Sequence, residues 1–378
     1  MPDDKSPKAA RKTCAVCKKS FFVNLKVCPN CGEKNQDPFI GRTISERFVV
    51  ESIIGEGGMG VVYKAWQAEQ KQGVAVKILR QEFSDDDLSV KRFKHEAMAA
   101  SRLSHSHIVA LYDYGTTVDD YLYMVMEIID GKSLAQLERE KRSIGVARTI
   151  KIITQVCDAL DHAHQNAVVH RDLKPGNIML TEFEDEPDYV KLVDFGLAKL
   201  LDQQGDPELE PKGEVLGSPL YMSPEQCLGR NLDGRSDIYS LGIVLYEALT
   251  GKVPYIGRTA QETIEMQVKN EPESFAAKRA DLYIPEQLEA VVRKSLAKDP
   301  NARQQTMREL ALELEAAVPK RIEPAVSISR TVDTSIKKPV KTIVTRKRNN
   351  KMSLTIGLLI ILVLAGFAYK FFLSNLPG

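Results

Sequence analysis

The sequence has little of what marks the specialised classes of protein. Only 6 of its 378 residues are Cys and 23 are Gly, which excludes a disulfide framework and a collagen-like chain. Residues 1–12 contain no apolar run, so they do not predict a secretory signal peptide. Wholesale disorder is excluded because 43% of the residues are hydrophobic. The length of this globular chain predicts about two or three domains.

Net charge is almost absent too, at +1, but the charges are strongly partitioned along the chain. Residues 1–36 hold 8 Lys or Arg and 3 Asp or Glu, a net charge of +5. Residues 37–320 hold 34 and 46, a net charge of −12, whereas residues 321–351 hold 9 and 2, a net charge of +7. An acidic body between two basic ends indicates more than one kind of domain.

One long hydrophobic run lies near the C-terminus. Residues 354–373 contain a single charge, Lys370, and a helix of that length spans about 30 Å, the thickness of a hydrocarbon core. A buried core helix is the alternative, but such helices are seldom apolar on every face. We therefore predict a transmembrane helix over 353–373 and an external tail over 374–378. Basic residues just before it predict a cytoplasmic N-terminal side and a single-pass protein of the cell membrane.

Four of the six cysteines lie close together near the N-terminus. Cys14 and Cys17 form one CxxC pair, and Cys28 and Cys31 form a second pair ten residues later. Two such pairs facing each other supply the four thiolates of a tetrahedral Zn²⁺ site. Disulfides and an iron site of the rubredoxin type are the alternatives. Residues 1–36 are thus predicted to be a zinc ribbon, which is too short to fold on a core alone.

A glycine-rich segment follows the β-like stretch 48–54. It contains Gly55, Gly57 and Gly60, a spacing that dinucleotide-binding turns share. Here a second β-like stretch, 61–65, follows the glycines, whereas a Rossmann turn would open a helix. The pattern favours a hairpin whose bare backbone can lie over a polyphosphate. Lys77 ends the next apolar strand, and Glu96 lies in a helical stretch as a candidate partner.

Three further motifs follow in order. His170-Arg-Asp-Leu-Lys-Pro-Gly-Asn177 comes after a helix-like segment, Asp194-Phe-Gly196 after an apolar strand, and Ser223-Pro-Glu225 after that. With these motifs the sequence resembles the eukaryotic-like serine/threonine protein kinases of bacteria over about residues 44–318. The resemblance implies a two-lobed α+β fold with a small lobe (44–130), a large lobe (131–318) and ATP between them.

The resemblance also assigns roles to single residues. It makes Asp172 the base that orients the substrate hydroxyl and Lys174 a partner of the transferred phosphate, as in serine/threonine kinases. Asp194 and Asn177 become the ligands of Mg²⁺ or Mn²⁺. Lys77 would hold the ATP phosphates and pair with Glu96. The residues it places around ATP are Ile54, Gly55, Glu56, Gly57, Gly58, Met59, Gly60, Val62, Ala75, Lys77, Glu96, Met126 (the gatekeeper), Glu127, Ile129 and Met179.

Two implied roles are structural. Asp237 resembles the buried aspartate that braces the catalytic loop, and Arg303 resembles the arginine that pairs with Glu225. The loop 197–216 departs from many relatives, because it contains no Ser, Thr or Tyr but several carboxylates. A carboxylate such as Glu210 could replace the usual phosphate opposite Arg171, or the loop could be plain solvated surface.

These observations predict an active, membrane-tethered serine/threonine protein kinase. A basic linker rich in Ser and Thr (319–352) would join the kinase to the membrane. ATP, protein substrates and the membrane are the expected partners, a homodimer for autophosphorylation is left open, and nucleic acid is disfavoured. The competing function is a pseudokinase or zinc-ribbon scaffold, against which the intact set of catalytic residues argues. A kinase of small molecules is a third alternative.

Overall fold

The computed structural model describes residues 11–13, 16–22, 27–32, 37–58, 60–84, 87–141, 144–195, 219–279, 281 and 283–318. Outside these residues lie Cys14, Met59, the whole loop from Gly196 to Ser218, the linker 319–352, the predicted membrane helix 353–373 and the tail 374–378. Among the helices of the described ranges, none is both long enough and apolar enough to cross a membrane.

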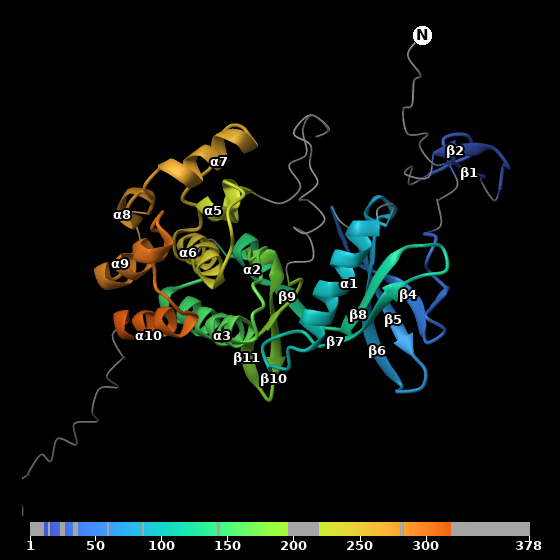
Figure 1. Ribbon diagram of the computed structural model, residues 1–378, viewed down its shortest axis with the longest axis horizontal. Coiled ribbons are helices and arrows are strands. Elements are labelled where there is room, and N and C mark those ends of the chain that lie inside the picture. The colour runs from blue at the N-terminus through green and yellow to red at the C-terminus, as the bar shows by residue number, and fades with distance from the viewer. Residues whose placement is uncertain are drawn as a thin grey trace, which may run out of the picture. The chain divides into compact units, whose positions relative to one another are not determined.

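A six-stranded antiparallel sheet and one helix form the small lobe (Figure 1). The strand order is β3-β4-β5-β6-β8-β7, and α1 packs beside β7. The elements are β3 (Thr43–Ile44), β4 (Phe48–Gly57), β5 (Gly60–Gln67), β6 (Gln72–Leu79), α1 (Asp87–Ser101), β7 (Leu111–Thr116) and β8 (Leu122–Glu127), with a 3-10 turn at Gln81–Phe83.

Alternating side chains divide the apolar residues of this sheet between its two faces. Phe48 and Val50 of β4, with Tyr63 and Ala65 of β5, are buried on one face. The opposite face buries a second cluster, which is Ala75, Leu79, Leu122, Met124 and Met126 with Phe93 and Ala97 of α1. Each face thus has its own core, and only the second one adjoins the helix.

Two residues before β3 also pack in the small lobe. Phe39 is buried in the first cluster, against the rings of Tyr63 and Tyr121. Asp37 accepts a hydrogen bond from the Tyr63 hydroxyl at 3.0 Å and another from the Phe39 amide at 2.9 Å. The small lobe therefore includes Asp37 and Phe39, which come before residue 44, the start predicted from the motifs.

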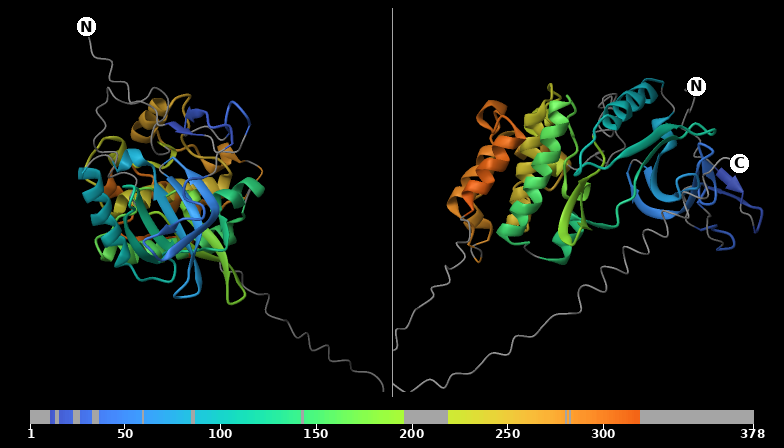
Figure 2. Two further views of the ribbon diagram at one scale, coloured as in Figure 1. Left: turned by 90° about the vertical axis from the view of Figure 1, so that its right-hand side faces the viewer. Right: turned by 90° about the horizontal axis from the view of Figure 1, so that it is seen from below.

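The large lobe is mainly helical, with a small three-stranded sheet ordered β11-β10-β9 (Figure 2). Its elements are β9 (Gly131–Ser133), α2 (Leu134–Glu140), α3 (Val146–Gln165), β10 (Ile178–Phe183), β11 (Glu186–Leu192), α5 (Pro224–Cys227), α6 (Gly234–Thr250), α7 (Ala260–Lys269), α8 (Phe275–Lys278), α9 (Glu286–Ser295) and α10 (Met307–Ala317), with 3-10 turns at Pro175–Asn177, Pro219–Tyr221 and Pro300–Ala302. A separate strand pair, β1 (Arg11–Thr13) and β2 (Ser20–Phe22), lies in the cysteine-rich segment.

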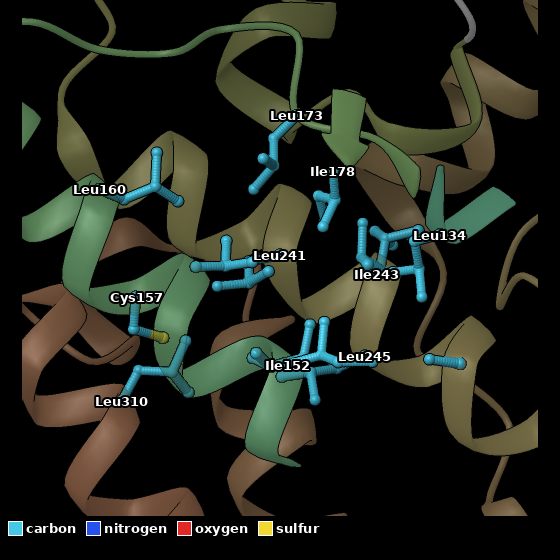
Figure 3. Packing of buried hydrophobic residues seen from close by; sticks show 14 of the residues in the cluster. Leu134, Ile152, Cys157, Leu160, Leu173, Ile178, Leu241, Ile243, Leu245 and Leu310 are labelled. Atoms are coloured by element: carbon cyan, nitrogen blue, oxygen red, sulfur yellow. The ribbon is translucent and has the colours of Figure 1, made fainter. Parts of the chain in front are cut away.

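Helix α6 is the centre of the large-lobe core. Its Leu241, Ile243 and Leu245 pack with residues of α3 and α10, among them Cys157 (Figure 3). Because α6 is apolar nearly all round, it must be enclosed by other helices. Asp233 caps its first turn, and Gly251 ends it in the left-handed conformation, with φ of 73°. Cys157 is 1% exposed, so its thiol is part of this core.

Candidate active site

The segment between α3 and β10 brings three polar side chains together. Lys174 Nζ donates to Asp172 Oδ2 at 2.7 Å, and Asn177 Nδ2 donates to the Asp172 carbonyl at 2.8 Å and to its Oδ2 at 3.2 Å. Pro175 begins a 3-10 turn that carries Asn177 back towards Asp172. The Asp172 carboxylate is thus held by an ammonium and an amide, a set of contacts that the sequence did not indicate.

Asp237 of α6 holds the backbone at His170 and Arg171 in place through hydrogen bonds. Its carboxylate accepts from the amides of His170 at 2.8 Å and Arg171 at 2.9 Å, and from His164 Nε2 at 2.7 Å. Burial would raise the pKa of Asp237, but these hydrogen bonds and the nearby histidines hold it below its usual range. Arg171 has φ of 65°, a conformation that the surrounding bonds must stabilise. The predicted bracing role of Asp237 is confirmed by these contacts.

Asp194 faces the same place from the end of the strand β11. Lys77 Nζ of β6 donates to Asp194 Oδ1 at 2.7 Å, so the contact joins the two lobes. Burial would raise the pKa of Asp194, but the Lys77 charge, with Lys174 and His170 nearby, holds it below its usual range. The predicted pairing of Lys77 with Glu96 concerns a side chain that lies outside what the structure describes, although the backbone of Glu96 is in α1.

The glycine-rich segment is the tip of a β4–β5 hairpin. Gly55 pairs with Val62 and Gly57 with Gly60 in an antiparallel register. A continuous hairpin excludes the dinucleotide-binding turn, in which a helix would follow the glycines. A Cβ on Gly60 would collide with the carbonyl of Ile78 in β6, so this position accepts only glycine. Close strand packing is therefore a structural reason for glycine at this position, in addition to the predicted place of Gly60 beside the phosphates.

Comparison with known proteins decides the family of this site. Residues 48–313 match the model described as the protein kinase domain. The chain belongs to the protein kinase family. Among curated relatives it is 39% identical over 281 residues to the serine/threonine-protein kinase pkn3 of Myxococcus xanthus, a match that covers 74% of the chain and 51% of that protein. It is 38% identical over 279 residues to PrkC of Bacillus subtilis, covering 74% and 41%. The chain thus spans about half the length of these relatives, or less.

Solved structures agree with this assignment. The PknI kinase domain of Mycobacterium tuberculosis superposes with a TM-score of 0.59 and 28% identity, covering 74% of the chain and 98% of that domain. The described body is therefore a protein kinase domain of the serine/threonine type, with the two lobes that the resemblance implied. The α+β, two-lobed architecture predicted from the sequence is confirmed.

Some of the residues predicted to surround ATP lie on the sheet face that adjoins α1, and Met179 lies in the large lobe. Ala75 and Met126 belong to one buried cluster, with Val62 packed against it, whereas Ile54 is 51% exposed. Met179 lies in β10, opposite Ser133. Next to Met126, Glu127 Oε2 pairs with Lys191 Nζ at 2.9 Å, which ties the end of β8 to β11 of the large lobe. The sequence did not indicate this last contact.

The predicted pair of Glu225 and Arg303 is present and almost fully buried. Arg303 donates through Nη1 and Nη2 to both oxygens of Glu225, at 2.8 and 2.9 Å. Ser236 of α6 also donates to Glu225 Oε1 at 2.7 Å. The next residue, Gln226, was missed by the sequence analysis, yet its Nε2 donates to the Arg171 carbonyl at 2.7 Å. The capping box that Ser223 forms with Gln226 was its only sequence signal.

Magnesium fits the ligands that this cleft offers. Asp194 supplies an ionised carboxylate, and in the described contacts the Asn177 side chain takes part only through Nδ2, which leaves its Oδ1 for an ion. Oxygen donors of this kind suit Mg²⁺ and Mn²⁺. In a complex with ATP, Asp194 and Asn177 would hold the ion, and Lys77 would turn from Asp194 to the phosphates.

Three of the four predicted zinc ligands gather in the cysteine-rich segment. The sulfur atoms of Cys17, Cys28 and Cys31 all lie within 4.8 Å of one another, and those of Cys17 and Cys28 are 3.6 Å apart. A hydrogen bond from the backbone at Lys19, with weaker help from Cys31, Asn30 and Cys28, lowers the pKa of Cys17 to about 6. Cys14, the fourth predicted ligand, lies outside the described residues.

Proposed function

We propose that the protein transfers the γ-phosphate of ATP to Ser and Thr hydroxyls of proteins, its own chain included. The single observation that carries this proposal is the arrangement of Asp172, Lys174 and Asn177 opposite Lys77 and Asp194. An incoming hydroxyl would donate to Asp172 and be oriented by it, while Lys174 beside that carboxylate would neutralise charge on the transferred phosphoryl group. Bound Mg²⁺ supplies charge neutralisation at the phosphates. Positioning of the reacting groups and electrostatic stabilisation by these side chains account for the rest of the rate acceleration.

An active kinase is favoured over a scaffold because the chain retains the catalytic residues of the kinase motifs. Lys77, Asp172, Asn177 and Asp194 are present and in contact in the pairs described above. The test is incubation of the purified chain with radiolabelled ATP, Mg²⁺ and a generic protein substrate. Phosphoserine and phosphothreonine are expected in the digest. Absence of both, in a folded protein that binds ATP, would favour the pseudokinase scaffold.

We further propose that residues 353–373 anchor the kinase in a membrane, with the kinase domain cytoplasmic. The proposal rests on the apolar run and on the basic residues Arg346, Lys347, Arg348 and Lys351 before it. Deleting residues 352–378 should release an active, soluble kinase, because the deletion lies beyond the kinase body, which ends with α10. Sedimentation of membranes at high salt measures this. A truncated protein that still pellets with the membranes contradicts the anchor.

Residues 1–36 are proposed to bind one Zn²⁺ through Cys14, Cys17, Cys28 and Cys31. The support is the close approach of three of the four sulfur atoms. About one zinc per chain is expected by elemental analysis, Cys28→Ser should lose it, and Cys227→Ser, outside the ribbon, should keep it. Removing the metal should unfold the ribbon without melting the kinase domain, because the metal-binding energy of such a small module is its folding energy. A single cooperative loss of both would contradict separate domains.

A further inference from the structure

The connection between α1 and β7 belongs structurally to both lobes. It begins where α1 of the small lobe ends, yet Leu103 and Ile108 are buried in the core of the large lobe. Its backbone also pairs with β11, because Leu192 N donates to the His107 carbonyl at 2.8 Å and Val109 N donates to the Leu192 carbonyl at 2.9 Å. This segment, residues 102–110, is called the joint below. It limits how α1 can move relative to the large lobe.

Histidines supply much of the polar contact at the joint. His105 Nδ1 accepts a hydrogen bond from the His107 amide at 3.2 Å, so this nitrogen cannot carry a proton while the bond exists. The other nitrogen, Nε2, lies 3.2 Å from Asp158 Oδ2 of α3 and donates to it. The contacts therefore require the neutral form of His105 with its proton on Nε2. His107 Nδ1 in turn donates to the Val190 carbonyl at 3.0 Å.

Half of the six histidines of the chain meet here. The His105 ring stacks on His162 of α3 with centroids 5.1 Å apart, and it lies 5.7 Å from the His107 ring. The Nε2 atom of His162 is buried and has no hydrogen-bond partner among the described residues. The titratable groups that face His105 are thus His107 on its own segment, and His162 and Asp158 on α3.

Burial, with smaller contributions from His162 and His107, lowers the pKa of His105 below its ordinary value of 6.5, although Asp158 acts in the opposite direction. A histidine with a lowered pKa binds fewer protons in the native state than in an opened state. Its contribution to the stability of the joint is therefore complete above about pH 6.5 and is lost as the pH falls below that value. Protonation places a hydrogen on Nδ1, which removes the bond from the His107 amide and sets a cation against two imidazole rings.

We propose that His105, His107 and His162 form a pH-sensitive joint, in which protonation of His105 loosens the link between α1 and the large lobe and slows phosphoryl transfer. The proposal rests on the proposed kinase activity. It acts through the position of α1, the helix that carries Glu96, and His105 itself is not among the residues predicted to surround ATP. His105 is thus a positioning residue.

The test compares kcat at pH 7.5 and pH 5.8 in the full-length protein and in His105→Asn. Asparagine retains an acceptor near the place of Nδ1 but does not titrate in this range. We expect the wild type to lose about fivefold more activity on acidification than His105→Asn does. The matched control is His95→Asn, on the exposed surface of α1, which should respond to pH like the wild type. Equal pH profiles for His105→Asn and the wild type would overturn the joint.

A second variant, Asp158→Asn, should shift the pH at which activity is lost, in a direction that the contacts of His105 predict. Asp158 raises the pKa of His105, and its side chain is 68% exposed, so Asp158→Asn should fold and should move the acid loss of activity to lower pH. NMR titration of the His105 ring should show the same shift. An unshifted ring titration in Asp158→Asn would contradict the proposal even if His105→Asn failed to fold.

One readout does not depend on activity. Hydrogen-exchange protection of the Val109 and Leu192 amides, corrected for the intrinsic effect of pH, should fall at pH 5.8 in the wild type and less in His105→Asn. If the protein showed this difference but phosphorylated nothing at any pH, the proposed function would fail and the joint would stand. If protection did not change, the joint would fail whatever the activity.

Discussion

Asp194→Asn is expected to abolish phosphorylation while leaving the kinase domain folded. Asparagine keeps the size of the side chain and a hydrogen bond for Lys77, but it removes the negative charge that a bound Mg²⁺ requires. Loss of such a charge-stabilising group costs about 10²–10³-fold in kcat. Lys77→Met should have a comparable effect, because it removes the ammonium that contacts Asp194 and that, in the proposed reaction, holds the ATP phosphates.

Initial rates with saturating ATP, together with thermal melting, separate effects on phosphoryl transfer from effects on folding in these two variants. Asp185→Asn is a matched control, since Asp185 is exposed in the turn between β10 and β11 and lies outside the cleft. The control should match the wild type in both measurements. Activity above a few per cent in purified Asp194→Asn would remove the assignment of Asp194 as metal ligand.

Arg303→Met is expected to lower the free energy of unfolding by about 3–5 kcal/mol, because it leaves Glu225 as an uncompensated buried charge. The side chain of Arg303 is 0% exposed and that of Glu225 is 8% exposed, so solvent cannot replace the lost partner. Arg308→Met, which removes an exposed arginine of α10, is the matched control and should change stability little. Denaturant unfolding of the purified kinase measures both variants.

The pair of Glu225 and Arg303 also makes the free energy of unfolding depend on pH in the acid range. Burial would raise the pKa of Glu225, but the hydrogen bonds and charge of Arg303 hold it below the ordinary value of 4.5. The pair therefore contributes fully above about pH 4.5, and its contribution is lost as the pH falls further through the lowered pKa. Arg303→Met should show a flatter dependence of unfolding free energy on pH in that range. Adding Glu225→Gln should restore part of the stability, and a double variant no more stable than Arg303→Met would contradict a charge effect.

Local sequence patterns predicted most of the active site. Asp172, Lys174 and Asn177 lie within six residues, and a 3-10 turn begun by Pro175 is enough to bring them together. The hairpin of β4 and β5 likewise followed from apolar stretches on both sides of the glycines. Such features depend on backbone conformation over a few residues, which side-chain type and spacing determine directly.

Other contacts had no local signal. Phe39 and Asp37 precede the first motif, and only the fold shows that they close one face of the small-lobe sheet. Gln226 lies beside a predicted motif, yet its contact with the Arg171 carbonyl spans 55 residues of the chain. Phe39 and Asp37 carry no pattern that distinguishes them from surface residues, and the capping box of Gln226 explains its place at the start of α5 but not this contact.

The sequence by itself determined the resemblance to the kinase family, the two-lobed architecture and the residues that meet within one turn or one hairpin. The tertiary structure alone decided that Lys77 contacts Asp194, 117 residues away, and that His105 lies between His107, His162 and Asp158. The physical reason is that the distance between such residues depends on how the cores of the two lobes pack against the joint that connects them. Burial of Leu103 and Ile108 in the large lobe fixes the joint in space, and no spacing along the chain encodes where a separately packed helix will lie beside it.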